Sequence, residues 1–576
     1  KLITKPNKVL KEIHKQVDIQ QKEFGRLFYE EIIPELAEHK IYLINCNKFS
    51  NRHKKEAKRY FEDVLEPKLN LKESIHKNKD SVFVENKTSY LAARLNESEF
   101  QLVKIPEDVP RFFNFSSEND EHYITFIDDI LKYSLQGKKE ETIYYAIKIS
   151  RDAELYIDDE FSGNLAEKIR ESLPKRNKGQ ATRVLIDEKM PKEFQGILKQ
   201  SLDVFNADIV LGGTYHNFKD FFNFPNPTKK DLSYKPLPPL PHQIQSSKES
   251  ILDIIDKKDQ LLHYPYQQFE SVIKLAEAAA DDDSVTTIKM TMYRIADDSR
   301  LNRAIARAAK KGKKVVVFIE VKARFDERNN LKWGEIFKQN GAKVIYSYPA
   351  IKVHSKILYI ERKVDDKTKR YCYIATGNFN ENTATLYTDF GLMTSDKSIT
   401  KDLKKVFMVL ERKIIVPKTK KLLVSPFNSR EIFAELIEHE IHLANQGKEG
   451  LIVLKMNSLE DERMINLLYK ANNAGVKIRL IVRGICCLVP GIEGQSENIL
   501  ITSVLDRFLE HGRVYLFGNG GYEKLYIGSA DWMTRNLTHR IEVITPILDK
   551  DHHKTIKNLL EIQLADNVKA RIIDKD

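Results

Sequence analysis

The sequence predicts a multidomain protein with α/β and α+β parts: a helical N-terminal remnant, an α+β head domain and two duplicated α/β domains. Three observations support this prediction. The chain has 576 residues, enough for about three or four domains. A proline-rich stretch, K-P-L-P-P-L-P-H, interrupts it near Pro236. Beyond that stretch helices and strands alternate, and one helix–glycine–strand pattern occurs twice.

The composition describes a soluble globular protein, with 41% hydrophobic and 31% charged residues. No apolar run reaches the ~18 residues that a membrane-spanning helix needs. A net charge of +11 favours an anionic partner such as nucleic acid, a phosphate polymer or a nucleotide, although an inert basic surface is the alternative. The cysteines share no zinc spacing, which suits free thiols in a reducing cytoplasm. They are Cys46, Cys372, Cys486 and Cys487.

The first part of the chain, residues 1–80, is highly charged and helical in pattern, with an amphipathic helix expected over 54–65. Residue 1 is Lys rather than Met, and no apolar signal-peptide core follows it. We therefore expect the chain to start inside a helical domain, and we assign residues 1–45 to the remnant of that domain.

The head domain, residues 46–235, mixes strands and helices. We predict strands over 89–95 and 142–149 and helices over 120–135 and 191–205. The domain ends in the aromatic-rich block G-G-T-Y-H-N-F-K-D-F-F-N-F-P, residues 212–225. This block is either a platform for an anion or a base, or a packed aromatic edge of the domain.

The four prolines between 236 and 241 predict a stiff connector and a domain boundary. The next domain, residues 236–420, alternates helices with strands that are apolar on both faces. We expect helices over 269–280, 301–311, 331–340 and 400–411, and strands over 284–293, 314–322 and 342–347.

The stretch K-V-H-S-K-I-L-Y-I-E, starting at Lys352, is followed by R-Y-C-Y-I-A-T-G-N and predicts a β-hairpin. Such a hairpin places His354 and Lys356 on one face, and the turn at Gly377-Asn378 offers backbone N–H groups to an anion. Together these groups predict a phosphate site that contains a nucleophile. The alternative is a half-buried strand histidine beside a solvated lysine.

A second copy of this pattern fills residues 421–576. Each copy has a helix, a glycine cap and a strand, with the glycines at Gly312 and Gly475. His354 lies 42 residues after the first glycine, and His511 lies 36 residues after the second. The motif H-G-R-V-Y mirrors H-S-K-I-L, and two chance histidines at matching places are improbable.

The two histidine motifs resemble the phospholipase D superfamily, in which two such halves face each other across one active site. Longer runs are similar to polyphosphate kinases of the first type, over nearly the whole chain. These runs are Y-H-N-F-K-D-F, I-A-T-G-N-F-N-E-N-T-A-T-L-Y-T-D-F, I-V-R-G-I-C-C-L-V-P-G-I-E-G and S-A-D-W-M-T-R-N-L. The resemblance implies two phospholipase D-like domains, and it implies that His354 takes phosphate from ATP and passes it to polyphosphate.

The resemblance also assigns nucleotide contacts to Tyr387, Arg483 and His511, and magnesium-associated roles to Arg294 and Arg324. Arginine and Mg²⁺ are both cations, so we expect these arginines to hold phosphates that carry the metal. The sequence departs from the family in two ways. It lacks the N-terminal nucleotide-contacting asparagine of the polyphosphate kinases. Its second motif is H-x-R instead of H-x-K, which fits the kinase and counts against a symmetric phospholipase or nuclease.

Two carboxylates follow the histidines at similar spacing. Asp389 lies 35 residues after His354, and Glu542 lies 31 residues after His511. A nucleophilic imidazole needs its other N–H held by an acceptor, so we predict that Asp389 orients His354 and Glu542 orients His511. The alternative for Asp389 is a turn or capping carboxylate.

The resemblance therefore implies a reversible ATP–polyphosphate phosphotransferase that uses a phosphohistidine, ATP or ADP, and Mg²⁺. The predicted catalytic set is His354, Lys356, His511, Asp389 and Glu542, with Asn378 at the phosphates. We expect His511 either to contact the nucleotide phosphates or to donate a proton to the leaving oxygen. No nucleic-acid partner is expected. The resemblance implies a cytoplasmic homo-oligomer, a dimer or tetramer, with peripheral membrane association. The rival functions are a phospholipase D-like phosphodiesterase or nuclease, and a non-catalytic polyanion-binding protein.

Overall fold

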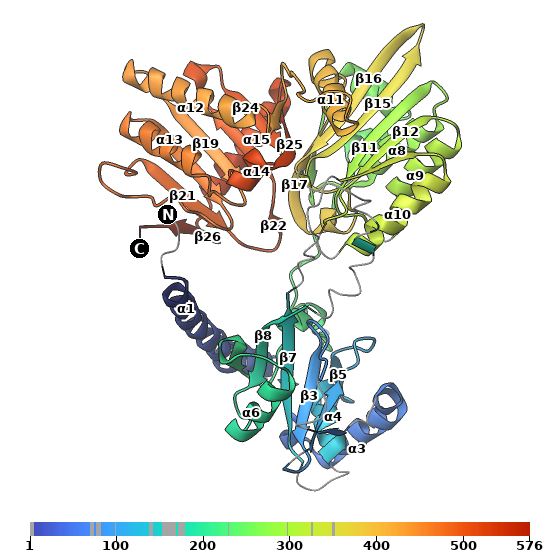
Figure 1. Ribbon diagram of the computed structural model, residues 1–576, viewed down its shortest axis with the longest axis vertical. Helices are drawn as coiled ribbons and strands as arrows, with labels where there is room; N and C mark the ends of the chain where they lie inside the picture. Colours follow the sequence, from blue (N-terminus) through green and yellow to red (C-terminus); the bar gives the residue numbers. More distant parts are fainter. Residues whose placement is uncertain are drawn as a thin grey trace. The chain divides into compact units, whose positions relative to one another are not determined.

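The computed structural model describes residues 5–69, 74–76, 82–97, 99–136, 142–152, 167, 169–170, 179–228, 230–296, 298–323, 326–347 and 352–575. The chain forms two compact units, Lys1–Leu155 with Ser172–Pro236, and Tyr156–Glu171 with Leu237–Asp576 (Figure 1). The boundary between Pro236 of the first unit and Leu237 of the second falls within the proline-rich stretch. The four-domain boundaries given above stay a prediction. Arg324 lies outside the described residues.

The first unit contains a three-stranded sheet of order β1-β6-β5 and a six-stranded sheet of order β2-β4-β3-β7-β8-β9. Its helices are α1 (Pro6–Arg26), α2 (Ile33–Glu38), α3 (Asn51–Tyr60), α4 (Ile127–Gln136) and α6 (Lys192–Ser201). Its strands are β1 (Ile41–Leu43), β2 (Ser74–His76), β3 (Ser89–Arg94), β4 (Glu99–Lys104), β5 (Phe112–Asn114), β6 (His122–Phe126), β7 (Tyr144–Arg151), β8 (Ala181–Asp187) and β9 (Ile209–Gly212). Apolar side chains of the six-stranded sheet pack against α6.

Two predictions for this unit were wrong in part. The predicted helix over 120–135 starts only at Ile127, because the aromatic and β-branched residues before it form strand β6 between β1 and β5. Ile41–Leu43, in the N-terminal region that was predicted to be helical, likewise form a strand, β1. The aromatic block has the packed arrangement, since Tyr215 stacks on Phe126 with the ring centroids 4.0 Å apart.

The second unit contains two mixed sheets, one of order β10-β17-β16-β15-β11-β12-β13 and one of order β14-β25-β24-β23-β19-β20-β21-β26. The strands from β10 to β17 are β10 (Gln260–Tyr264), β11 (Val285–Met292), β12 (Lys314–Ile319), β13 (Lys343–Tyr346), β14 (Lys352–Val353), β15 (Lys356–Val364), β16 (Lys367–Ala375) and β17 (Tyr387–Thr394). Those that follow are β18 (Leu423–Ser425), β19 (Leu451–Met456), β20 (Lys477–Val482), β21 (Ile499–Val504), β22 (Leu509–Glu510), β23 (Arg513–Phe517), β24 (Lys524–Gly528), β25 (Arg540–Pro546) and β26 (Ala570–Ile573).

Helices cover these sheets (Figure 1). They are α7 (Ile251–Lys257), α8 (Glu270–Asp281), α9 (Arg300–Lys310), α10 (Glu327–Gln339), α11 (Lys397–Leu410), α12 (Ser429–Asn445), α13 (Glu462–Asn473), α14 (Thr534–Thr538) and α15 (Lys550–Leu564). In the first sheet, α9 and α10 pack on β12 while α11 packs on β15 and β16. In the second sheet, α12 packs on β19 and β23 while α13 packs on β20.

The predicted duplication is confirmed strand by strand. β11, β12, the β15–β16 hairpin and β17 correspond to β19, β20, the β23–β24 hairpin and β25. The glycines that follow α9 and α13 adopt a left-handed backbone, with φ of +83° at Gly312 and +87° at Gly475. A side chain strains this conformation, and glycine therefore ends both helices and returns the chain into the next parallel strand.

The two sheets exchange short strands. β14, just before His354, pairs in parallel with β25 of the second sheet, and β22, just before His511, pairs in parallel with β17 of the first. The hairpin prediction was therefore wrong at its start. The strand breaks after Val353, the backbone N–H groups of His354 and Ser355 both donate to Ile541 O at 3.0 Å, and the hairpin begins at Lys356.

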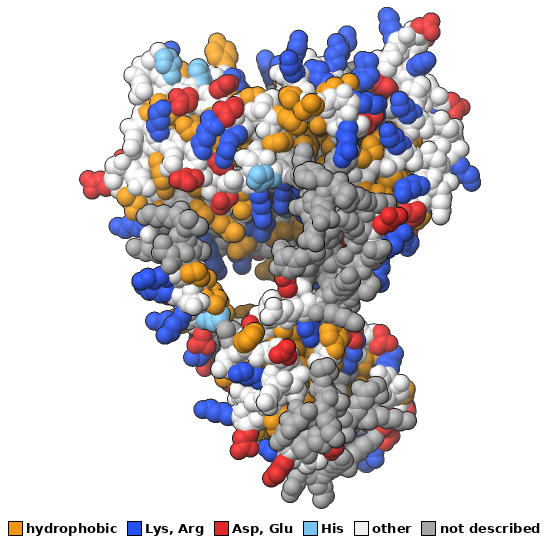
Figure 2. All heavy atoms as spheres, in the orientation of Figure 1, with side chains coloured by type: hydrophobic (Ala, Val, Ile, Leu, Met, Phe, Trp, Pro, Cys, Tyr) orange, Lys and Arg blue, Asp and Glu red, His pale blue; other side chains and the backbone are white. Residues whose placement is uncertain are grey.

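On the face drawn in Figure 2, Lys and Arg side chains are spread widely among acidic ones and do not form a single patch. This face therefore shows no single location for the positive net charge. No helix among the described residues combines the length and the apolar character that crossing a bilayer requires.

Candidate active site

His354 lies between β14 and the β15–β16 hairpin, where 12% of its side-chain surface is exposed. Its Nδ1 atom lies 3.0 Å from both carboxylate oxygens of Glu542 on β25. A carboxylate accepts a hydrogen bond, so the ring proton sits on Nδ1. The Nε2 atom has no hydrogen-bond partner within the described part of the chain. Within the described residues, the Nε2 lone pair of His354 is therefore not engaged by a hydrogen-bond donor.

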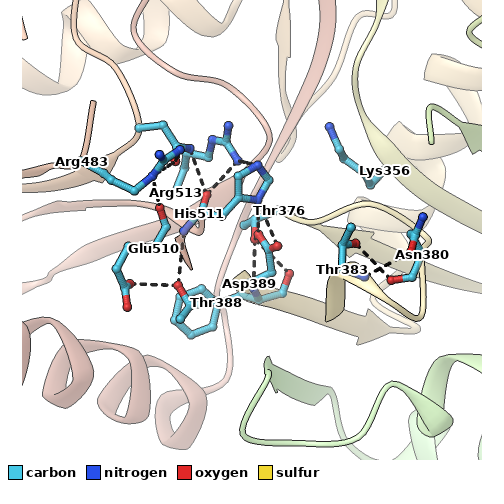
Figure 3. Close-up of polar contacts among 12 residues, drawn as sticks. Lys356, Thr376, Asn380, Thr383, Thr388, Asp389, Arg483, Glu510, His511 and Arg513 are labelled. Atoms are coloured by element: carbon cyan, nitrogen blue, oxygen red, sulfur yellow. Dashed lines mark hydrogen bonds and ion pairs between the residues drawn. The ribbon is translucent and has the colours of Figure 1, made fainter. Parts of the chain in front are cut away.

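His511 occupies the matching position after β22, with 13% of its side-chain surface exposed. Its Nδ1 atom lies 2.8 and 3.0 Å from the two carboxylate oxygens of Asp389 on β17 (Figure 3). The ring of Tyr387, at the start of β17, lies 5.3 Å from the His511 ring between centroids. Each histidine is thus oriented by a carboxylate from the other sheet.

This arrangement reverses the predicted pairing. The sequence prediction gave Asp389 to His354 and Glu542 to His511, because each carboxylate follows its histidine in the same half. The structure pairs His354 with Glu542 and His511 with Asp389. The exchanged strands β14 and β22 are the physical reason, since each carries its histidine to the carboxylate-bearing strand of the other sheet.

Both carboxylates are held by further contacts. Glu542 accepts hydrogen bonds from Ser529 Oγ and, at 2.7 Å, from Asn536 Nδ2. Asp389 accepts one from Thr376 Oγ1, which precedes Gly377. A Cβ atom on Gly377 would lie 2.3 Å from Asp389 Oδ2, so glycine at this turn makes room for the carboxylate.

The surroundings of His354 are cationic. Burial is the main reason why the pKa of His354 lies well below its usual value, and the charges of Lys356, Arg540 and Arg513 lower it further. The ring is therefore neutral at pH 7, as a nucleophile must be. Burial also lowers the pKa of Lys356 to about 7 and raises the pKa of Glu542 to about 7.

Lys356 donates to the carbonyl oxygen of His354, and its Nζ atom lies 5.3 Å from the centroid of the Tyr293 ring. The same ring meets His354 edge-on, with the centroids 5.0 Å apart. Lys352 Nζ also lies 5.3 Å from that centroid. The structure thus brings Lys356 next to His354 as predicted, although not on the face of one continuous hairpin.

Around His511, Arg513 and Arg483 lie side by side (Figure 3). Arg513 Nη1 donates to His511 Nε2 at 3.1 Å and to His511 O at 2.8 Å. Arg483 Nε donates to Glu510 O at 2.7 Å and to Asn457 Oδ1 at 3.0 Å. These guanidinium groups and Lys356 together form a cationic site that fits phosphate oxygens.

The structure also describes two other predicted site residues, Asn378 and Arg294. Asn378 has a buried side-chain oxygen without a hydrogen-bond partner among the described residues. Arg294 is 41% exposed in its side chain and lies 3.5 Å from Asp326.

Sequence reasoning did not single out Tyr293, Arg540, Asn457, Asp531 or Glu320. The duplication carried a signal for two of them, since Asp531 matches Asn378 and Arg540 matches Tyr387.

The described residues contain no group of three or more His, Cys, Asp or Glu side chains that would hold a metal ion. The carboxylates nearest the two histidines are committed to the imidazole rings. The described side chains therefore do not fit a resident metal centre.

The comparisons with known proteins are consistent along the chain. Three sequence models match: the polyphosphate kinase middle domain at residues 52–224, its C-terminal domain 1 at 250–416 and its C-terminal domain 2 at 422–576. Polyphosphate kinase of Escherichia coli (strain K12) is 40% identical over 585 residues, covering 99% of this chain and 85% of that relative. The Yersinia pestis polyphosphate kinase is 39% identical, covering 99% and 84%.

Among solved structures, the crystal structure of polyphosphate kinase from Porphyromonas gingivalis is 36% identical with a TM-score of 0.86, and the match covers 98% of this chain and 86% of that one. The second unit is built from two duplicated α/β domains, each of which contributes one histidine to a cationic site, and the first unit is α+β. This architecture confirms the predicted multidomain α/β and α+β fold class. The chain belongs to the polyphosphate kinase family.

Proposed function

We propose that this chain is a polyphosphate kinase that moves the terminal phosphate of ATP to inorganic polyphosphate through a phosphohistidine on His354. The observation that carries this proposal is the hydrogen bonding of the two nitrogen atoms of the His354 ring. Its Nδ1 is held by Glu542 at 3.0 Å, and its Nε2 is without a hydrogen-bond partner within the described part of the chain. Relatives of this chain bear the name polyphosphate kinase.

In the first half-reaction the Nε2 lone pair of His354 attacks the γ-phosphorus of ATP. A nitrogen–phosphorus bond forms while the bond from that phosphorus to the bridging oxygen breaks, and ADP leaves with the electron pair. In the second half-reaction a terminal oxygen of polyphosphate attacks the phosphorus, and the imidazole regains its lone pair. The reverse sequence recharges ADP from polyphosphate.

The surrounding residues supply positioning and charge, which phosphoryl transfer needs most. Glu542 orients His354 and stabilises positive charge that develops on the ring. Lys356, Arg483 and the half-exposed Arg294 hold phosphate oxygens. Arg513 contributes its positive charge from its buried place beside His511 and Asp531. Tyr387 stacks on the adenine beside His511. Asn378 contacts a phosphate at the turn after β16.

His511 takes part as a nucleotide contact. Burial and the charge of Arg513 lower its pKa against the opposing effect of Asp389. The ring is therefore neutral, and Nε2 accepts a hydrogen bond from Arg513. This geometry favours a positioning role for His511 over proton donation. Mg²⁺ enters as part of the nucleotide substrate, and its charge offsets that of the phosphates.

The location in the cytoplasm, the peripheral membrane contact and the homo-oligomer implied by the family stay predictions.

The test is incubation of the full chain with γ-labelled ATP and Mg²⁺. We expect acid-labile, base-stable label on the protein that is lost in His354→Ala. His439→Ala is the matched control, because His439 is an exposed histidine on α12. Persistence of the label in His354→Ala overturns the assignment. A phosphodiesterase would instead hydrolyse diester bonds without nucleotide, and a mere polyanion-binding protein would take no label.

A further inference from the structure

The two halves of the site are related by duplication, yet their histidines differ at Nε2. His354 and His511 have nearly equal side-chain exposure, 12% and 13%, and each has its Nδ1 on a carboxylate. Nε2 of His511 accepts a hydrogen bond from Arg513, whereas Nε2 of His354 has no such partner in the part of the chain that is described. Exposure and tautomer therefore do not distinguish the two rings, but the engagement of the lone pair does.

The difference begins at the second residue after each histidine. The side chain of Lys356 has one nitrogen atom, Nζ, which donates to the carbonyl oxygen of His354. Arg513 has a fork of donors, so its Nη1 reaches both the carbonyl oxygen and the ring nitrogen of His511, at 2.8 and 3.1 Å (Figure 3). A lysine at that position has no second donor nitrogen with which to make the ring contact.

A second difference fixes the arginine. Asp531 stands in the duplicated turn where the first half has Asn378. Asp531 accepts from Arg513 Nε at 3.2 Å and from Nη2 at 3.1 Å, so the guanidinium is held along its other edge. Both residues are buried, with Arg513 3% and Asp531 8% exposed. Burial opposes ionisation of Asp531, but Arg513 lowers its pKa to about 2, which keeps the ion pair intact.

We infer that Arg513, anchored by Asp531, is a positioning residue that occupies the Nε2 lone pair of His511 and so makes His354 the single phosphate-accepting histidine. A nucleophilic nitrogen must direct its lone pair at phosphorus, and at His511 that pair already accepts an N–H from a guanidinium. The consequence for phosphate transfer depends on the proposed function, whereas the lone-pair engagement does not.

The test measures lone-pair availability without nucleotide. Diethyl pyrocarbonate acylates an unprotonated imidazole nitrogen, and peptide mass spectrometry of the full chain gives the rate for each histidine. A hydrogen bond from a charged group makes a nitrogen roughly tenfold less available. We expect His511 to react about tenfold more slowly than His354 in the wild type. Arg513→Lys and Asp531→Asn should each raise the His511 rate several-fold while the His354 rate stays constant.

Equal rates at the two histidines of the wild-type chain overturn the inference, and this comparison does not depend on whether a variant folds. An unchanged His511 rate in a folded Asp531→Asn variant overturns it as well.

Labelled ATP separates this inference from the proposed function. Label on His354 alone supports both. Label on His511 as well as His354 in the wild type overturns the inference but leaves phosphohistidine chemistry standing. No label on either histidine contradicts the proposed function, and the acylation rates then still decide whether Arg513 engages His511.

Discussion

The imidazole of His354 and the carboxylate of Glu542 are 188 residues apart in the sequence and 3.0 Å apart in the structure. They come from different sheets of the second unit. The same relationship holds between His511 and Asp389, over 122 residues and 2.8 Å. Each half of the duplication therefore completes the histidine site of the other half. Neither half has an oriented histidine by itself.

This exchange gives the first prediction. Glu542→Gln should slow the labelling of His354 by about 100-fold, because a carboxylate that orients a functional histidine typically contributes ~10- to 100-fold. Asp389→Asn is the matched control, since its carboxylate orients His511. It should leave the single-turnover rate of His354 labelling at saturating ATP within a few-fold of wild type. Loss of labelling in Asp389→Asn together with normal labelling in Glu542→Gln would restore the same-half pairing.

The second prediction concerns pH. Burial raises the pKa of Glu542 to about 7 and lowers the pKa of Lys356 to about 7. As pH falls below this value Glu542 loses its negative charge and His354 loses its charged acceptor. As pH rises above it Lys356 loses its positive charge and phosphate is held less well. The single-turnover rate of His354 labelling should therefore be bell-shaped with a maximum near pH 7.

Two variants test which group causes the decline on each side of the pH profile. Lys356→Arg should remove the decline at alkaline pH, because a guanidinium stays charged. Glu542→Gln should give a lower rate that no longer declines toward acid pH. Profiles that keep both declines in these variants would show that other groups control the reaction.

The third prediction concerns Glu320, which is buried and accepts a hydrogen bond from Val353 N at 2.9 Å. It thereby fixes the backbone just before His354. Glu320→Gln leaves one buried donor unsatisfied, so we expect a loss of about 1–3 kcal/mol in the free energy of unfolding of the second unit. It should also slow His354 labelling several-fold.

Glu411→Gln is the control variant that separates loss of stability from loss of His354 positioning. Glu411 is a buried carboxylate paired with Lys289 and touches neither histidine. This variant should lose comparable stability in thermal or denaturant unfolding but keep the wild-type labelling rate. Equal labelling rates in both variants would remove the positioning role of Glu320.

The fourth prediction concerns Tyr387, whose ring lies beside His511. Tyr387→Leu should raise the KM for ATP about tenfold, because stacking on a base contributes ~1–3 kcal/mol. Tyr387→Phe keeps the ring and should stay near the wild-type KM. Steady-state kinetics with ATP as the varied substrate measure both. Equal values for Leu and Phe would mean that the ring only packs against the protein.

The sequence by itself determined the repeated parts of this protein. The glycines at 312 and 475, the histidine motifs and the carboxylates at 389 and 542 are local features. Local chemistry fixes them, because a left-handed turn requires glycine and an apolar run forms a buried strand. The family resemblance followed from these same stretches.

Only the tertiary structure decided which carboxylate serves which histidine. Similar spacing in the two halves made the same-half pairing the natural prediction, and nothing local to His354 opposes it. The choice is made by β14 and β22, two-residue strands that pair with the opposite sheet. Such a pairing depends on main-chain hydrogen bonds between distant segments, and main-chain groups carry no signature in the side-chain sequence. The contact of Arg513 with His511 Nε2 was hidden in the same way.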